Sequence, residues 1–397
     1  MSAQPTSPAL MPDMRAFVHR SPATRLVLGD GCIGRLGEEL AGLGIRRPLV
    51  LTGTRVRASA LYRHAHEALA AADHVLAEPV PAHSSVALVE RLARRVRAKG
   101  IDGFVAIGGG SASDTAKAVC LLAAEGGRLA DHAVRFTPPA TLVAPPLRAP
   151  KLPIVALPGT ASGAEVTPSL GVRDEEGAKL LLTDFQLAAR LVLIDPAATL
   201  DIPAALMCAT GMNGLAHCIE GLYSRERSPL AETIGLDAIG RFFTALPAVH
   251  RQPHDPHARA ALLYAAHLSG LVLINARTCL HHAVCHAIGA VTGVGHGAAN
   301  AVMLPHSVAF NAEEAAAPLA RAAAALPGGG TGAGELVSAL RWLQTAAGVP
   351  TRLRDIGVPA DALDRIAAKS LRERGLFYNP RPVADASPLR ALLEAAF

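Results

Sequence analysis

The most informative segment of this chain is DGFVAIGGGSASDTAKA, residues 102–118. Residues 104–107 form a short apolar run typical of a buried strand, and three glycines then allow a tight turn. Ser111 or Ser113 is predicted to cap a helix that continues through Val119. A strand, a turn without side chains and a helix N-terminus present backbone N–H groups and the positive end of the helix dipole to an anion. We therefore predict a turn that binds a diphosphate.

An ordinary glycine-rich connection between a strand and a helix would explain three glycines equally well. The polar residues Asp114, Thr115 and Lys117 at the helix start favour a nucleotide site instead. The residues of this turn expected to contact the cofactor are Gly108, Gly109, Gly110, Ser111 and Asp114.

The first half of the chain alternates strand-like and helix-like segments, which is typical of a parallel sheet covered on both faces. Strands are expected at residues 26–28, 48–52, 74–79, 104–107, 152–157 and 192–196, and helices at 33–43, 58–72 and 86–98. Residues 126–150 contain several prolines and small residues, so we expect an irregular insertion there. The predicted fold of this half is α/β and Rossmann-like.

Beyond Leu200 strand signals almost vanish, and long patterns rich in alanine and leucine run to Phe397. We therefore predict an all-α domain after the α/β domain. The expected boundaries are a flexible tail at 1–14, a dinucleotide-binding α/β domain at 15–198, and a helical domain with the histidine site at 199–397.

Composition excludes several classes of protein. The 397 residues carry a net charge of +5, but lysine and arginine are scattered and aromatic residues are few, which argues against nucleic-acid binding. The six cysteines form no C-x-x-C pair, so we expect small core residues in a reducing compartment. No apolar stretch reaches about 18 residues and no secretory signal is visible, so we expect a cytoplasmic protein without a membrane span.

Histidines concentrate in the second half. Asn213 and His217 lie one helical turn apart, His282 and His286 repeat this spacing, and His296 follows in the turn GVGHG. Asn213, His217, His282 and His296 could hold a divalent metal such as Fe or Zn with one open position. Because the Asn213 amide is neutral, it would not balance the metal charge, and the alternative is that the same histidines only move protons. We expect structural roles for five further histidines of this half, which are His250, His254, His257, His267 and His306.

These motifs together resemble the iron-containing alcohol dehydrogenase superfamily, in which a Rossmann-like half precedes a helical metal-binding half. Residues 108–118 resemble the family's diphosphate loop. The resemblance implies that His217, His282 and His296 are metal ligands and that His286 transfers a proton. The family's fourth ligand is an aspartate, where this chain has Asn213.

Four segments resemble one branch, the maleylacetate reductases: PGTASGAEVTP (158–168), GMNGLAHCIEGLYS (211–224) with its asparagine, LHHAVCH (280–286) and FYNPRPV (377–383). Two features depart from that branch. Ala283 stands where the branch has a lysine, and GGGSASD with the 126–150 insertion is more similar to simple alcohol dehydrogenases.

This resemblance implies an NAD(P)H-dependent oxidoreductase that reduces maleylacetate to 3-oxoadipate in aromatic catabolism. Hydride would leave the nicotinamide, with His286, His282 and His217 as the catalytic side chains. Thr160 and Ser162 would line the nicotinamide and ribose. Candidate partners for substrate carboxylates or phosphate are Lys117, Lys179 and Arg277, of which Lys179 is also a cofactor candidate, although each alone could be a solvated charge. The expected partners are a small substrate, for which the resemblance implies a dicarboxylate, and a second copy of the chain in a homodimer.

The cofactor choice has one indication in the sequence. After the second predicted strand an acidic residue would bind the adenosine ribose, but Gly53 stands there with Arg55 and Arg57 close by. NADPH should therefore be accepted, and the expected cofactor is NADPH or NADH. Three alternatives to a maleylacetate reductase stay open: a metal-dependent alcohol or aldehyde dehydrogenase, a lyase similar to sugar-phosphate cyclases, and a non-catalytic homologue.

Overall fold

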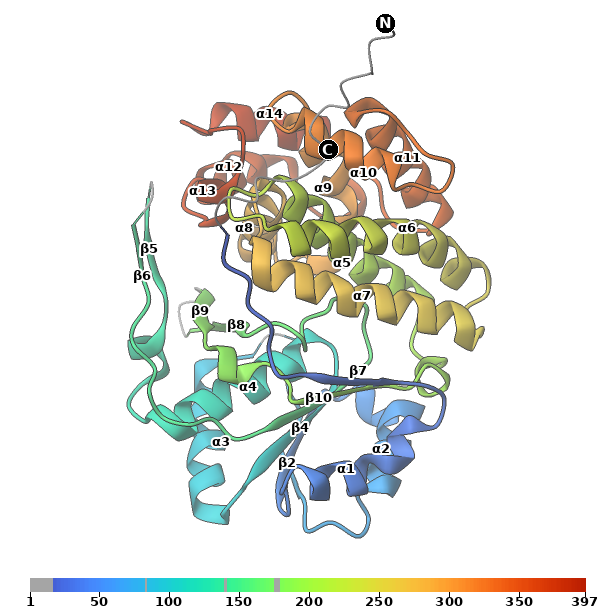
Figure 1. Ribbon diagram of the computed structural model, residues 1–397. Helices are drawn as coiled ribbons and strands as arrows, with labels where there is room; N and C mark the ends of the chain where they lie inside the picture. Colours follow the sequence, from blue (N-terminus) through green and yellow to red (C-terminus); the bar gives the residue numbers. More distant parts are fainter. Residues whose placement is uncertain (1–16, 83, 139–140, 175–178) are drawn as a thin grey trace, which may run out of the picture.

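The computed structural model describes residues 17–82, 84–138, 141–174 and 179–397. Figure 1 shows two halves, with a twisted sheet and its helices in the lower half and a bundle of helices in the upper half. The last strand of the sheet ends at Ile194 and the first long helix begins at Ala204.

The N-terminal half contains a six-stranded parallel sheet with the strand order β1-β10-β7-β4-β2-β3. Its strands are β1 (Arg25–Leu28), β2 (Pro48–Thr52), β3 (Val75–Leu76), β4 (Gly103–Gly108), β7 (Ile154–Pro158) and β10 (Leu191–Ile194). The four central strands are buried along their whole length, as continuous apolar runs in a parallel sheet require. The predicted α/β, Rossmann-like class is confirmed.

Alternate residues of the central strands face opposite layers of helices. Val105 and Ile107 pack in one core with α1 (Leu36–Gly42) and α2 (Ala60–Ala68), whereas Phe104 and Ala106 pack in another core with α3 (Val86–Lys99) and α4 (Gly110–Glu125). Because the side-chain period of a strand is two, one apolar run supplies both cores.

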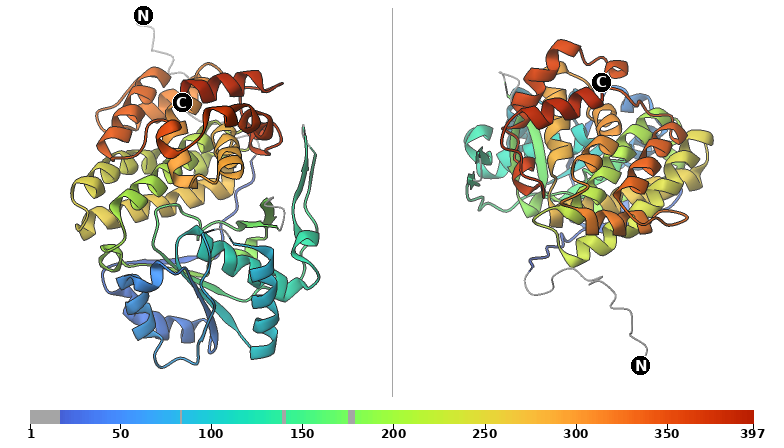
Figure 2. Two further views of the ribbon diagram at one scale, coloured as in Figure 1. Left: turned by 180° about the vertical axis from the view of Figure 1, so that it is seen from behind. Right: turned by 90° about the horizontal axis from the view of Figure 1, so that it is seen from above.

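Two antiparallel hairpins interrupt the alternation. β5 (Arg135–Thr137) pairs with β6 (Thr141–Val143), so the expectation of an irregular segment over 126–150 is wrong in part. This ribbon stands out beside the molecule in both Figure 1 and Figure 2, and its largely exposed residues gave no hydrophobic pattern to detect. The second hairpin joins β8 (Ser169–Arg173) to β9 (Lys179–Thr183) and was not predicted.

The C-terminal half is helical, as predicted, and residues 195–397, all of them described, contain no strand. Its helices are α5 (Ala204–Tyr223), α6 (Pro229–Arg251), α7 (Pro256–Ala276), α8 (Leu280–Thr292), α9 (His296–Phe310), α10 (Ala316–Ala324), α11 (Ala333–Ala346), α12 (Leu363–Ser370), α13 (Gly375–Tyr378) and α14 (Ser387–Ala395). Almost every residue of α5 from Met207 onward is buried, because α6, α7 and α9 surround this helix.

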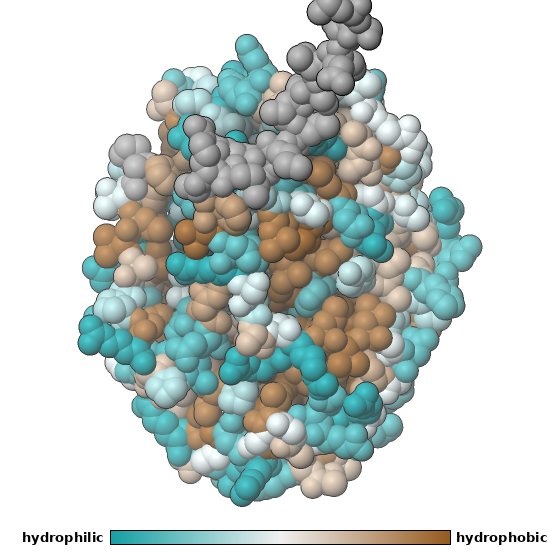
Figure 3. All heavy atoms as spheres, in the orientation of Figure 1, coloured by the Kyte–Doolittle hydropathy of each residue, from teal (hydrophilic) through white to brown (hydrophobic). Residues whose placement is uncertain are grey.

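The cysteines and the most apolar helix lie in the interior of the protein. All six cysteines are buried and none forms a disulfide. Within the described residues, only α7 is long and apolar enough to cross a membrane, and 67% of its most apolar window is buried inside the protein. Figure 3 shows hydrophobic and hydrophilic residues intermixed over the face seen in Figure 1.

His267 on α7 gives a prediction about acid stability. Burial lowers the pKa of His267 to about 4, from an ordinary value of 6.5. Between these two values the unfolded chain binds a proton that the folded chain resists, so stability falls as the pH drops through this window. We expect His267→Leu to remove about 2 kcal/mol of the loss in unfolding free energy between pH 7 and pH 5. Urea unfolding at both pH values measures it, and equal pH dependence in the two proteins would contradict it.

Candidate functional site

The glycine turn lies where β4 ends and α4 begins. Gly108 has a φ of 124°, a conformation that favours glycine. Gly109 is the residue that caps α4, and no side chain accepts a hydrogen bond there. The predicted serine cap is therefore wrong: Ser111 and Ser113 lie in the first turn, and Ser111 Oγ donates to the carbonyl of Ala82 at 2.6 Å. The helix start is left to backbone N–H groups, which suits an anion.

The loop of residues 158–168 lies directly on this turn. The Gly159 N–H donates to the Gly108 carbonyl at 2.9 Å. A Cβ at Gly109 would lie 3.0 Å from Thr160 Cγ2. Thr160 thus lies against the predicted diphosphate turn, and its role in lining the cofactor stays a prediction. Ser162 Oγ, from the same loop, is buried without a hydrogen-bond partner among the described residues.

Gly53 and Asp114 lie close to this turn in different settings. Gly53 follows β2 and forms an isolated parallel bridge with Val80. Asp114 Oδ2 accepts a hydrogen bond from the Gly171 N–H at 3.1 Å, which ties α4 to β8. A cofactor role for Asp114 stays a prediction, and its carboxylate also holds the hairpin in place.

Lys117 is a structural residue, so its interpretation as a partner for substrate carboxylates is wrong. Its side chain is fully buried, and Nζ donates to the carbonyls of Ala164 at 2.6 Å and Ser169 at 3.3 Å. Burial lowers the pKa of Lys117, while the nearby carboxylates of Asp114 and Glu165 oppose that shift. Lys117 therefore anchors the loop 158–168 to α4.

The histidines from α5, α8 and the start of α9 form one cluster. The rings of His217 and His282 stack with centroids 4.7 Å apart, and those of His286 and His296 stack at 5.3 Å. His282 and His296 join the two pairs at 5.8 Å. The fifth member, His281, lies edge-on to His282. The prediction that distant histidines meet is confirmed, and the other histidines of this half make no ring contact with the cluster in the described structure.

A buried carboxyl group orients the central histidine. Glu220 Oε2 lies 2.6 Å from His282 Nδ1, and His282 Nε2 lies 3.0 Å from Asn213 Oδ1. Burial raises the pKa of Glu220 and lowers the pKa of His282. Both shifts favour a neutral pair, in which the carboxyl proton bonds to Nδ1 and the Nε2–H donates to Asn213. Burial also lowers the pKa of His217 to about 3, so this ring is neutral near pH 7.

His286 is more accessible than His217 and His282, and it has its own acidic partner. Its Nδ1 lies 3.5 Å from Glu373 Oε2, and both side chains are 23% exposed. Burial and the charge of Lys179 lower the pKa of His286, whereas Glu373 opposes this. Burial would raise the pKa of Glu373, but the contact with His286 and the charge of Lys179 hold it below its ordinary value. Lys179 comes from the sheet half, so charges from both halves meet here.

The four predicted metal-site residues come together, but their arrangement does not fit a metal ion. Within the described residues, no group of three or more histidine, cysteine, aspartate or glutamate side chains could hold one. An imidazole binds metal in its ring plane, and the planes of His217 and His282 are within 17° of parallel. The Nε2 of His282 is engaged by the neutral Asn213.

Asn213→Asp is expected to increase metal affinity, because a carboxylate supplies the missing negative charge beside His282. After dialysis against Zn²⁺ and removal of free metal, the variant should retain zinc near one ion per chain and the unaltered protein far less. Metal analysis of both proteins measures this. Equal zinc contents would contradict it, and Asn300→Asp is a control for a nonspecific effect of charge, because Asn300 bonds to His281 instead.

The glycine turn and the histidine cluster lie at the same interface between the halves. The loop 158–168 connects them. One side of this loop contacts the glycine turn. Its other side packs closely on α5, because a Cβ at Gly214 would lie 3.1 Å from the Ala161 carbonyl. Gly214 follows Asn213 directly in the chain. Gly163 of this loop also touches α7, where its Cβ would lie 2.4 Å from the Ala266 carbonyl.

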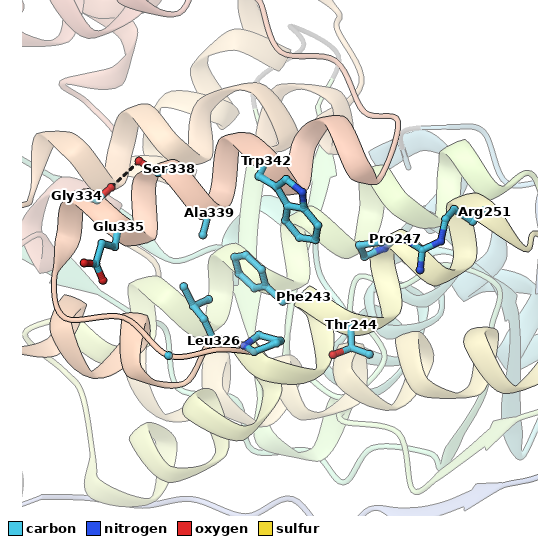
Figure 4. Close-up of a pocket in the computed structure, with 12 residues that line it drawn as sticks. Phe243, Thr244, Pro247, Arg251, Leu326, Gly334, Glu335, Ser338, Ala339 and Trp342 are labelled. Atoms are coloured by element: carbon cyan, nitrogen blue, oxygen red, sulfur yellow. Dashed lines mark hydrogen bonds between the residues drawn. The ribbon is translucent and has the colours of Figure 1, made fainter.

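A separate pocket of about 740 Å³ lies on the helical half, between α6, α11 and the loop before α11. In Figure 4 Phe243 and Trp342 face one another across it, with Arg251 at one end and Glu335 at the other. Its lining contains no histidine or cysteine, so it offers none of the proton-transfer groups of the cluster.

Several residues of the site were not identified from the sequence. Glu220 could have been, because it lies one turn after His217 on the same helix. Asn300 holds the start of α9 by bonding both to His281 Nε2 at 2.7 Å and to the His296 carbonyl at 2.8 Å. Glu373 lies far along the chain, with no local signal.

Comparison with known proteins agrees with this architecture. Residues 23–196 match the family model for iron-containing alcohol dehydrogenase, and residues 207–397 match the model for the C-terminal part of that family. The chain is similar to a maleylacetate reductase from Rhizobium sp. (strain MTP-10005), at 32% identity over 97% of this chain and 98% of the relative. It is also similar to a 4-hydroxybutyrate dehydrogenase from Cupriavidus necator, at 31% identity over 94% and 97%.

A solved structure, the maleylacetate reductase of Agrobacterium tumefaciens, superposes with a TM-score of 0.80 at 30% identity, covering 97% of this chain and 99% of that one. A parallel sheet half with a glycine turn, a helical half with clustered histidines, and matches along nearly the whole chain agree with one another. This chain belongs to the iron-containing alcohol dehydrogenase family of oxidoreductases.

Proposed function

We propose that this protein reduces maleylacetate or a closely similar unsaturated oxo-dicarboxylate with NAD(P)H. The observation that carries the proposal is the contact chain at the interface: the uncapped start of α4, the loop 158–168, and the histidines on α5 and α8. A diphosphate on the glycine turn would extend the cofactor along Thr160 toward His286. The similarity to maleylacetate reductases supports the choice of substrate.

The reaction can be written with this chain's own residues. The glycine turn and Thr160 would hold NAD(P)H, which would supply a hydride to the alkene carbon remote from the ketone, and the electron pair of the C=C bond would then form an enolate. Neutral N–H groups of the cluster stabilise the enolate oxygen. The imidazolium form of His286, which Glu373 stabilises, delivers one proton to the adjacent carbon and becomes neutral. The products are NAD(P)⁺ and the saturated 3-oxo dicarboxylate.

The cofactor is NADPH or NADH, and acceptance of NADPH follows from the end of β2. Gly53 offers no carboxylate to repel a 2′-phosphate, and Arg55 is exposed without a described ion pair. Arg57 is less available, because its guanidinium donates to the Ala77 carbonyl at 2.6 Å.

A second candidate is a dehydrogenase of a short hydroxy acid. The similarity to the 4-hydroxybutyrate dehydrogenase favours it, and a monocarboxylate would need fewer cations than a dicarboxylate. In that case His286 would accept the proton of the alcohol oxygen during oxidation and donate a proton to the aldehyde oxygen during reduction.

We also propose a cytoplasmic homodimer. β1 is an edge strand, and residues before and within it leave Phe17, Val18 and Leu28 exposed. An exposed edge with apolar side chains suits pairing with a second copy. Light scattering of the purified protein measures the mass, and a monomer at micromolar concentration would contradict the dimer.

One assay tests the function. The purified protein is supplied with NADH or NADPH and, in separate reactions, with maleylacetate, succinic semialdehyde and uncharged aldehydes, before and after treatment with a chelator. We expect oxidation of NADPH to be fastest with maleylacetate and unchanged by the chelator. Preference for succinic semialdehyde would establish the second candidate, and strong preference for NADH would overturn the NADPH assignment.

A further inference from the structure

Arg277 has an unusual backbone. It is the one non-glycine residue with a positive φ in the described part of the chain, at 64°, and it links α7 to α8. Residues other than glycine keep such a conformation only where the surrounding structure holds them there, and these positions concentrate at binding sites. The Arg277 side chain is half-buried, yet it makes no hydrogen bond or ion pair with any described residue.

Arg374 lies beside the same segment. A Cβ at Gly375 would lie 2.4 Å from the Cys279 carbonyl and 3.3 Å from the Cβ of Ala283. Asn379 Oδ1 accepts from the Leu280 N–H at 3.3 Å, so the chain around 375–379 is bound to the start of α8. This contact brings Arg374 into electrostatic interaction with Arg277.

Lys179 adds a third cation from the sheet half. Its side chain lies over Gly171, where its Cε takes the place that a Cβ would occupy. Lys179 interacts electrostatically with Arg374, with Glu373 and with His286. The residue as a whole is exposed, but its ammonium group is crowded by protein, and Asp114 is the other carboxylate near it.

The three positive side chains outnumber the two carboxylates near them. Neither Arg374 nor Lys179 forms an ion pair or a side-chain hydrogen bond with a described residue, and the same holds for Arg277. Glu373 is engaged with His286, and Asp114 accepts from Gly171. Like charges that interact destabilise one another unless an anion lies between them. Guanidinium groups bind a carboxylate through paired hydrogen bonds, so a carboxylate fits this place well.

We propose that Arg277, Arg374 and Lys179 form a carboxylate subsite beside His286, which holds one carboxylate of a dicarboxylate substrate while His286 meets its reacting carbon. This inference rests on the proposed function and names the residues that would select a dicarboxylate. The subsite joins both halves, because Lys179 comes from β9 and the arginines from the helical half.

The test compares Arg277→Gln and Arg374→Gln with Arg372→Gln, an exposed arginine close by that has no described ion pair. Two quantities are measured: KM for maleylacetate, and the dissociation constant of maleate, a dicarboxylate without the ketone, by calorimetry on the cofactor-bound protein. We expect both to rise roughly 10- to 100-fold in the two subsite variants, as for the loss of a charged hydrogen bond. Turnover at saturation, KM for NADPH, and all values for Arg372→Gln should change little, and Arg374→Lys should recover part of the loss.

Unchanged maleate binding in both subsite variants would overturn the subsite. If the protein does not reduce maleylacetate, the proposed function fails, but calorimetry with maleate still tests the subsite. Should Arg374→Gln fail to fold, Arg277→Gln and Lys179→Gln carry the same test. A weakening of inorganic phosphate binding without any effect on maleate would identify a general anion site and contradict the proposal.

Discussion

Replacing His286 by alanine is expected to lower turnover by about 10²- to 10⁴-fold, the usual contribution of a positioned proton donor. The His286 ring is partly exposed and its Nδ1 faces Glu373, which leaves Nε2 free for a substrate. The dissociation constant of NADPH should stay the same, because the glycine turn and Thr160, which contact one another, are separate from the pair of His286 and Glu373 in the described structure. Stopped-flow measurement of NADPH oxidation and a fluorescence titration measure the two quantities.

Two further variants sharpen this expectation. Glu373→Gln should also slow turnover, by less, because the imidazolium of His286 loses its stabilising charge. His306→Gln serves as the control, since His306 lies on α9 outside the ring contacts of the cluster. Because surrounding protein and Lys179 lower the pKa of His286, its protonated fraction falls as the pH rises above the acid range, and reduction should slow with it. An unchanged rate in His286→Ala would remove this residue from the mechanism.

Local sequence patterns were sufficient to predict most strands of the sheet half. The apolar run at 48–52 coincides with β2, because a central parallel strand needs nothing except continuous burial and a turn at each end. The β8–β9 hairpin was not found, since its stability comes from Leu170 and Val172 packing into the core beneath α4, which is a tertiary contact. The serine cap failed for a related reason: Ser111 finds an acceptor in Ala82, which lies far from it in sequence.

At the histidine site, too, local features could be predicted from the sequence, whereas tertiary contacts could not. The spacing of His282 and His286 predicted a shared helix face, and the structure places both in the cluster. Spacing within one helix says nothing about which distant residues meet that face. Glu373 and Arg374 reach it only because the chain around Gly375 packs on Cys279. The prediction for Lys117 is wrong for the same physical reason. A lysine at a helix start near a predicted nucleotide site is expected to bind ligand, but the loop 158–168 buries it, and the sequence does not show where that loop lies.

Gly163→Ala is expected to destabilise the protein by about 2–5 kcal/mol, the sum of a left-handed backbone strain and overpacking. Gly163 has a φ of 68°, and a Cβ there would lie 2.4 Å from the Ala266 carbonyl and 2.9 Å from the Gly270 nitrogen. Both atoms belong to the backbone of α7, so no side-chain rotation relieves the clash. The loop 158–168 must move away from the helical half instead.

The displacement should also weaken cofactor binding, because the same loop holds Thr160 against Gly109. Urea unfolding followed by circular dichroism measures the stability, and titration with NADPH measures the second effect. Gly334→Ala is the matched control: Gly334 lies in α11 with open space around it, so alanine there should leave stability equal or slightly higher. If Gly163→Ala unfolds at the same urea concentration as the unaltered protein, the close packing of this loop against α7 is incorrect. In that event the contact chain from the glycine turn to the histidine cluster loses its central connection.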